Sequence, residues 1–180
     1  MTNRYLSTGR LEKFMKSLII LIVLTAQLPA LAQESKEDKK AAQAAVLKDR
    51  VDSKRFAFRA LSALVSGAAT RQFTRQLSGS YYTLTVLSDS VVSDLPYFGR
   101  LYQSPMGQDG GIKFNSTQSD YTVKGRKKGG WDIKIKTKDV SNSPQLYLTI
   151  SPNGSASLRV SCTDRQSISY EGIIEEPHKK

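Results

Sequence analysis

The 180-residue chain carries 27 basic and 16 acidic residues, a formal net charge of +11, and it contains a single cysteine and a single histidine. The lone cysteine excludes an internal disulfide framework. The lone histidine, His178, lies in a charged C-terminal tail, which excludes a Ser-His-Asp or Cys-His catalytic unit of the usual kind and any multi-histidine metal site.

Residues 1–32 have the three parts of a secretory signal peptide. The basic start contains Arg4, Arg10, Lys13 and Lys16. An apolar run follows over residues 17–28, and Ala30 and Ala32 then give the small-x-small spacing of a cleavage site. The run of about 12 residues is shorter than the roughly 18 that suggest a membrane span. Whether translation starts at Met1 or Met15 stays open.

Cleavage after Ala32 would release a mature protein that begins at Gln33 and has no transmembrane segment. We expect it in the periplasm or outside the cell. No cysteine stands directly after the cleavage site, where a lipid anchor would be attached. The 148 remaining residues suit one domain and carry 23 basic and 15 acidic residues, a net charge of +8. This balance is compatible with an acidic or amphipathic envelope ligand, and the alternative, which we favour, is a basic domain whose charges are only solvated. The aromatic residues do not interleave with the basic ones, so no nucleic acid is expected, and we expect a monomer.

Residues 33–53 are predicted to form an N-terminal helix. Acidic residues near its start suit the helix dipole, and alanines at 41, 42, 44 and 45 are strong helix formers. After residue 53 the period changes, because Phe56, Phe58 and Ala60 alternate with other residues as in a half-buried strand. A helix that continues through Leu64 is the alternative. Residues 62–75 are small, polar and basic, and are predicted to be a loop.

From Tyr81 onward, alternation of apolar and polar residues predicts β structure. Short connections such as Ser88-Asp89-Ser90 and Ser151-Pro152-Asn153-Gly154 favour antiparallel neighbours. The predicted fold is α+β and mainly β, with the helix packed on a curved antiparallel sheet or partly closed barrel of about eight to ten strands. The β domain covers residues 54–174, and residues 175–180 form a frayed tail.

Three consecutive strands are predicted to share one core on their apolar faces. Its members are Trp131, Ile133, Ile135, Leu146, Leu148, Ile150, Leu158, Val160 and Cys162. Cys162 is either a reactive thiol or a small buried residue, and its alternation with the apolar residues before it favours burial.

The segment from Leu95 to Tyr102 has the most unusual composition in the chain, with three aromatic residues, one proline and one glycine. Two interpretations stay open. In the first, Tyr97, Phe98, Arg100 and Tyr102 bind a ligand through aromatic faces and a guanidinium group. In the second, which we favour, the segment is a structural corner whose rings are buried and whose arginine pairs with a carboxylate or carbonyls.

The run Leu95-Pro96-Tyr97-Phe98-Gly99-Arg100, followed by Gly110-Gly111-Ile112-Lys113-Phe114, resembles the bacterial exported family known as domain of unknown function 4251. Residues 56–60 and 165–172 also resemble that family's pattern, and the match covers about residues 40–174. The resemblance implies a signal-bearing envelope protein of Gram-negative bacteria. It implies no activity, cofactor or catalytic residue.

We therefore expect an exported envelope protein that is a non-catalytic binding or accessory module, with no cofactor and no metal. The first alternative is a structural or assembly protein that acts through a sheet edge or through the basic hairpin tip at residues 126–130. The second is a hydrolase with paired carboxylates, although the acidic residues are scattered and lie mostly near turns.

Overall fold

The computed structural model describes residues 28–66, 72–78, 82–102 and 110–177. The chain divides into two compact units, residues 1–41 and residues 42–180. The helix α2 (Leu28–Asp52) begins in the first unit and ends in the second. It starts earlier than the predicted residue 33 and contains Ala30 and Ala32. The rest of the predicted signal peptide lies outside the described residues.

All ten described strands belong to one antiparallel sheet in the second unit. They are β1 (Phe56–Ser66), β2 (Gln72–Gln76), β3 (Thr83–Val86), β4 (Val91–Leu95), β5 (Ile112–Ser116), β6 (Ser119–Gly125), β7 (Trp131–Thr137), β8 (Gln145–Ile150), β9 (Ser155–Ser161) and β10 (Ile168–Glu175).

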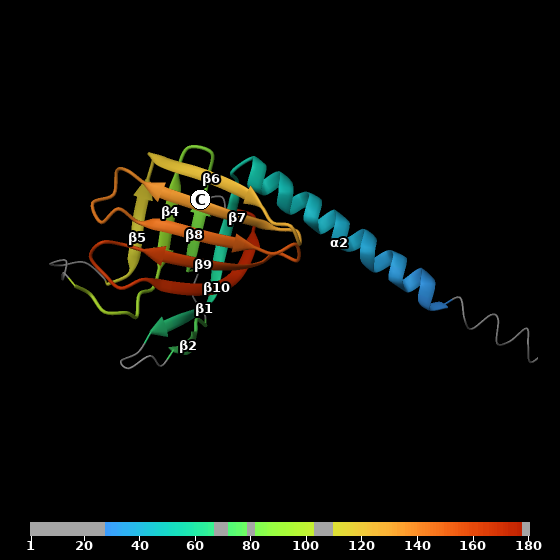
Figure 1. Ribbon diagram of the computed structural model, residues 1–180, viewed down its shortest axis with the longest axis horizontal. Coiled ribbons are helices and arrows are strands. Elements are labelled where there is room, and N and C mark those ends of the chain that lie inside the picture. Colours follow the sequence, from blue (N-terminus) through green and yellow to red (C-terminus); the bar gives the residue numbers. More distant parts are fainter. Residues whose placement is uncertain (1–27, 67–71, 79–81, 103–109, 178–180) are drawn as a thin grey trace, which may run out of the picture. The chain divides into compact units, whose positions relative to one another are not determined.

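The strand order is β5-β4-β3-β1-β10-β9-β8-β7-β6, with β2 paired to β1 beside this path. Strands β6 to β9 cross in front of β1, β4 and β5 (Figure 1), so the sheet curls over itself and is nearly closed like a barrel. The predicted fold class, mainly β with one N-terminal helix, is confirmed. Curling gives a long sheet one interior face on which its apolar residues can be buried together.

β1 is the longest strand and holds the sheet together. β10 pairs along most of one side of it, while β3 pairs with residues 56–59 and β2 with residues 62–66 on the other side. The predicted loop over residues 62–75 is therefore wrong, because β1 continues to Ser66 and β2 begins at Gln72. Composition suggested a loop because these residues are small and polar. The pairing of Ala63 with the large, buried Tyr170 of β10 explains the small residue.

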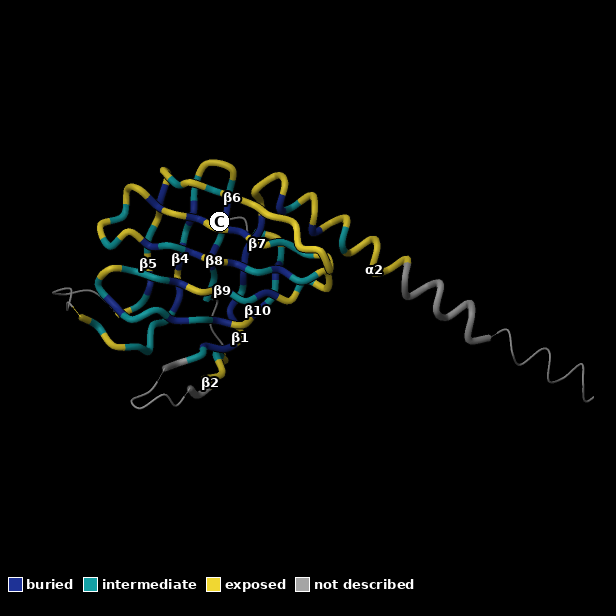
Figure 2. The backbone as a smooth tube through the Cα atoms, in the orientation of Figure 1, coloured by how far each residue is buried: buried dark blue, intermediate teal, exposed yellow. Residues whose placement is uncertain are grey.

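The predicted core is confirmed at seven of its nine positions, the apolar residues of β7, β8 and β9. Buried and exposed residues alternate along these strands in Figure 2. Trp131 and Cys162 are only half-buried. Trp131 is the first residue of β7 and Cys162 follows the last residue of β9, so each lies at the margin of the interior.

The last turns of α2 supply two further residues to this core, Leu47 and Val51, which are 5% and 1% exposed. The Tyr121 hydroxyl of β6 donates a hydrogen bond of 3.3 Å to the Val51 carbonyl oxygen. No helix within the described residues is long and apolar enough to cross a membrane.

Candidate functional site

The corner after β4 is held by the segment that leads into β10. Leu95 is fully buried, and the Tyr170 hydroxyl donates a 2.6 Å hydrogen bond to the Pro96 carbonyl oxygen. Leu101 forms a β-bridge with Arg165. The Tyr97 hydroxyl lies 2.8 Å from the Arg100 carbonyl oxygen and 2.9 Å from that of Gln166, so it can donate its proton to either. Two distant parts of the chain are thereby joined by main-chain and side-chain hydrogen bonds.

Arg165 lies at the centre of this junction and is only 6% exposed. Its Nη1 atom donates to the Gly110 and Gly111 carbonyl oxygens at 3.1 and 3.0 Å. Its Nε and Nη2 atoms donate to the Asp164 carboxylate, and the guanidinium lies 5.1 Å from the Tyr97 ring centroid. Because a buried guanidinium needs partners for its five donors, this arrangement stabilises one geometry of three segments.

The electrostatics of the junction follow from these contacts. The hydrogen bonds from Arg165 hold the pKa of the Asp164 carboxyl below its ordinary value. Burial raises the pKa of the Tyr97 phenol. At neutral pH the Asp164 carboxylate therefore stays charged and accepts hydrogen bonds, while the Tyr97 phenol stays neutral and donates its proton.

The four residues predicted for a ligand patch are placed differently from one another. Tyr97 and Phe98 are half-buried and face different arginines, since Arg75 lies 4.4 Å from the Phe98 ring centroid. Arg100 is exposed, and Tyr102 is 63% exposed. The arginine that pairs with a carboxylate and carbonyls is Arg165, which the sequence did not single out as a site residue. Its place within the run that resembles the known family was the one available signal.

A second candidate surface lies on the outer face of the sheet, around Tyr147 of β8. This residue is 41% exposed, and the Lys134 amine of β7 lies 5.3 Å from its ring centroid. Lys134 and Arg159 of β9 are the register partners of Tyr147 on its two sides. Because residues opposite each other in an antiparallel pair share a face, the ring lies between two cations. Together with Lys124, these residues form what we call the Tyr147 surface.

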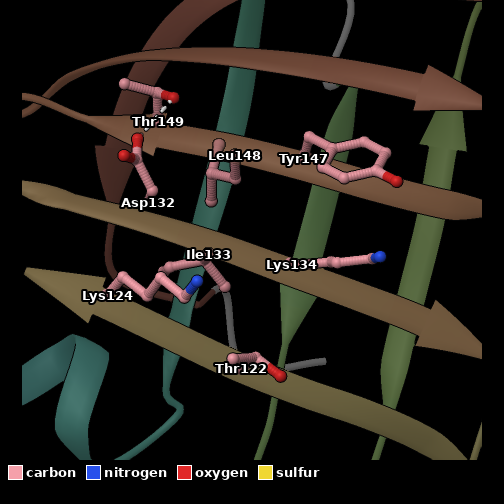
Figure 3. Close-up of a pocket in the computed structure, with 8 residues that line it drawn as sticks. All are labelled: Thr122, Lys124, Asp132, Ile133, Lys134, Tyr147, Leu148 and Thr149. Carbon is pink, nitrogen blue, oxygen red and sulfur yellow. Dashed lines mark hydrogen bonds between the residues drawn. The ribbon is translucent and has the colours of Figure 1, made fainter.

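A hollow of about 310 Å³ opens on this surface. Figure 3 shows its lining, with Thr122 and Lys124 from β6, Asp132 and Lys134 from β7, and Tyr147 and Thr149 from β8. The buried core residues Ile133 and Leu148 complete the lining. Alternation along β7 buries the isoleucines and turns the lysines outward.

The hollow is lined by two basic side chains, Lys124 and Lys134, and by one acidic side chain, Asp132. The Asp132 carboxylate accepts a 2.9 Å hydrogen bond from the Thr149 hydroxyl and lies 3.7 Å from Arg126 Nε. Among the described residues no ion pair is formed by Lys134 or by Lys124, although Lys124 is the register partner of Asp132. The surface thus offers two amines, an aromatic face and hydroxyl groups, which suit an anionic ligand with an apolar part.

No group of three or more histidine, cysteine, aspartate or glutamate residues in the described parts of the chain is arranged to hold a metal ion. The Cys162 thiol is half-buried, and burial raises its pKa to about 11. A thiol in that state is a weak nucleophile at neutral pH because little of it is thiolate.

The fold and these surfaces define a small, mainly β, barrel-like domain with a helix at its start and a basic outer face. The chain belongs to the family described as Domain of unknown function (DUF4251), whose model matches residues 38–174. The predicted family resemblance is therefore confirmed.

Among solved structures, the chain is similar to a DUF4251 family protein from Bacteroides eggerthii DSM 20697. The two are 16% identical with a TM-score of 0.59, and the match covers 76% of this chain and 91% of the other. At this identity the likeness shows the fold. No curated protein matches the chain.

Proposed function

We propose that this chain is an exported bacterial envelope protein that acts as a non-catalytic binding module, and that it binds an acidic or amphipathic ligand on the Tyr147 surface. The observation that carries the binding role is the 310 Å³ hollow, in which an exposed aromatic ring lies among amines without carboxylate partners in the described chain. The net positive charge of the chain favours the same class of ligand.

Export is supported by the sequence of residues 1–32, with its basic start, its short apolar run and Ala30-x-Ala32. The test is mass spectrometry of the protein recovered from the periplasm or the medium of its host. The expected N-terminus is Gln33. An intact N-terminus in the membrane fraction would contradict this part of the proposal.

The ligand proposal is tested by purification from the native envelope, with mass spectrometry of whatever co-elutes, and by titration with an acidic polysaccharide beside a neutral one. Tyr147→Ala and Lys134→Ala should each weaken binding of the acidic polymer. Because exposed charges are screened by salt, binding should also fall between low and high ionic strength.

The matched control is Tyr102→Ala, which removes an exposed ring from the corner that was the other predicted binding surface. We expect this variant to bind like the parent. If Tyr102→Ala or Arg100→Ala abolishes binding while Tyr147→Ala does not, the ligand binds at the corner, and the Tyr147 surface is the wrong assignment.

A further inference from the structure

The edge of β6 ends the sheet. Among the described strands, β6 pairs with β7 alone and stands at one end of the nine-strand path. A seven-residue edge strand presents backbone N–H and C=O groups that another strand can pair with. Soluble proteins commonly block such an edge with a short strand, a proline, a bulge or charged side chains, and the charges of β6, Asp120 and Lys124, are of opposite sign. β6 has no proline, and its register with β7 runs unbroken from Ser119 to Gly125.

Val123 is exposed although its register partner on β7 is buried. It is the register partner of Ile133, which is 2% exposed, so both lie on the core-facing side of the sheet. Val123 is nevertheless 37% exposed, because no described strand lies beyond β6 to cover it. The edge therefore leaves an incompletely covered apolar position on the interior face.

The sequence of β6 is complementary to itself. When two copies pair antiparallel about a two-fold axis at Thr122, Asp120 of each lies opposite Lys124 of the other. Tyr121 of each then lies opposite Val123 of the other, an aromatic and a β-branched residue of the kind that stabilises strand pairs. An axis at Tyr121 would also keep the two core faces on one side, but it places neither charge opposite a complement. An axis at Val123 places Asp120 opposite Arg126, which lies beyond the end of β6, and leaves Lys124 opposite Thr122. Only the axis at Thr122 pairs both charges of β6 within the strand.

We propose that this protein forms a two-fold dimer through its β6 strands, in the register centred on Thr122. The occupant of the edge is a second copy of this chain, since the charge pattern and the aromatic and β-branched pairing are both reciprocal, as an isologous interface requires. The dimer joins two sheets and places two Tyr147 surfaces on one continuous face. This differs from the monomer expected in the sequence analysis, and it does not depend on the ligand proposal.

Charge reversal across the axis is the decisive test, with association measured by sedimentation equilibrium of the purified chain. Asp120→Lys places two lysines opposite each other, and Lys124→Asp places two aspartates opposite each other. Each single variant should raise the dissociation constant by roughly tenfold or more, because each change acts twice in a two-fold dimer. The double variant, Asp120→Lys with Lys124→Asp, should restore association.

Two controls separate the interface from side effects. Lys138→Ala removes the ion pair that Lys138 makes with Asp120 within one copy, and it should leave the dimer intact. Lys128→Asp changes the net charge as much as Lys124→Asp but lies in the hairpin tip outside β6, and it should also leave the dimer intact.

The apolar pair gives an independent readout. Val123→Ser should weaken association, whereas Val46→Ser, at a more exposed valine on α2, should not. Three results would overturn the proposal: a parent chain that stays monomeric at concentrations up to about 1 mM, a dimer insensitive to the single charge reversals, or a double reversal that fails to restore a dimer lost in the single variants. The second result would assign the dimer to another surface.

Discussion

At the scale of single residues, the corner after β4 shows how a few side chains join distant segments. Arg165 contacts Asp164, the carbonyls of Gly110 and Gly111, and the ring of Tyr97. Gly99 is needed beside this network for lack of space, since a Cβ atom there would lie 2.4 Å from the Tyr97 hydroxyl oxygen. The backbone of Gly99 is not among those with positive φ, so its requirement is steric.

Arg165→Met should destabilise the fold by about 3–5 kcal/mol, because it leaves two carbonyl oxygens without this donor and a mostly buried carboxylate with only the long hydrogen bonds from Asn142 Nδ2. The measurement is urea denaturation of the parent and the variant. Arg100→Ala, at an exposed position of the same corner, is the control and should stay within about 0.5 kcal/mol of the parent. Equal losses in the two variants would contradict the central role of Arg165.

Gly99→Ala should cost about 1–3 kcal/mol through overpacking against Tyr97. The physical cause can be isolated with a double-mutant cycle, since contacting residues give non-additive losses. In a Tyr97→Ala background the ring is absent, and the further change at Gly99 should cost less than about 0.5 kcal/mol. An additive cycle would show that the glycine is needed for another reason.

Cys162 should react slowly with iodoacetamide in the native protein. Burial raises its pKa from 9.0 to about 11, so at pH 8 the thiolate fraction is about a hundredfold lower than in the unfolded chain. Labelling followed by mass spectrometry should show this difference. Because the folded pKa is the higher one, Cys162 also makes stability fall as pH rises between about 9 and 11. Equal labelling rates with and without denaturant would contradict its burial.

At the scale of elements, β7, β8 and β9 divide cleanly into a buried face and a solvent face. Leu148 is 1% exposed while its neighbour Tyr147 is 41% exposed. The interior face provides the core, and the solvent face provides the Tyr147 surface. A one-residue change of register would exchange the two faces and lose both.

Leu148→Ala should cost about 2–5 kcal/mol, since it removes buried apolar atoms and leaves a cavity. Tyr147→Ala, one residue earlier on the opposite face, removes more atoms but should cost under about 1 kcal/mol, most of it from the contact with Lys134. Thermal or urea unfolding of the pair tests the face assignment. The reverse order of losses would show that the register is wrong.

At the scale of the whole molecule, the sheet returns on itself through the two-residue link between β5 and β6. Asp139, just beyond β7, accepts hydrogen bonds from the Ser116 hydroxyl and from the backbone N–H groups of Thr117 and Gln118. These bonds hold the pKa of Asp139 below its ordinary value. One carboxylate therefore holds the link between the two ends of the strand path against β7.

Acid should destabilise the protein, because the pKa values of Asp139 and Asp164 are both lower in the folded chain than the ordinary 3.8. Stability from these groups is complete above that value and is lost as pH falls below it, where the unfolded chain takes up protons first. Urea denaturation from pH 7 to pH 2 measures this, and Asp164→Asn should reduce the decline. An identical decline in the variant would mean that Asp164 does not contribute to it.

Local pattern determined much of this architecture. Alternation along a strand predicts its buried face, because the face of each side chain depends on its place in that strand. This holds for Ile133 and Ile135, which alternate with lysines, and for Leu146 and Leu148, which alternate with polar residues. The mainly β fold and the family resemblance could be read in the same way. The strand over residues 62–66 could not, because its small and polar residues suggest a loop and it is held between β2 on one side and β10, about a hundred residues further along the chain, on the other.

Tertiary structure alone decided the rest. Arg165 looks like a turn residue in the sequence, and only the fold brings Gly110, Gly111 and Tyr97 within its reach. The Tyr147 surface draws on four consecutive strands, and the pairing registers of β7, β8 and β9 place Tyr147 between Lys134 and Arg159. The physical reason is the same in both cases: side-chain direction is set by neighbours in sequence, whereas a site is set by which strands pair, and that depends on the burial of the whole sheet.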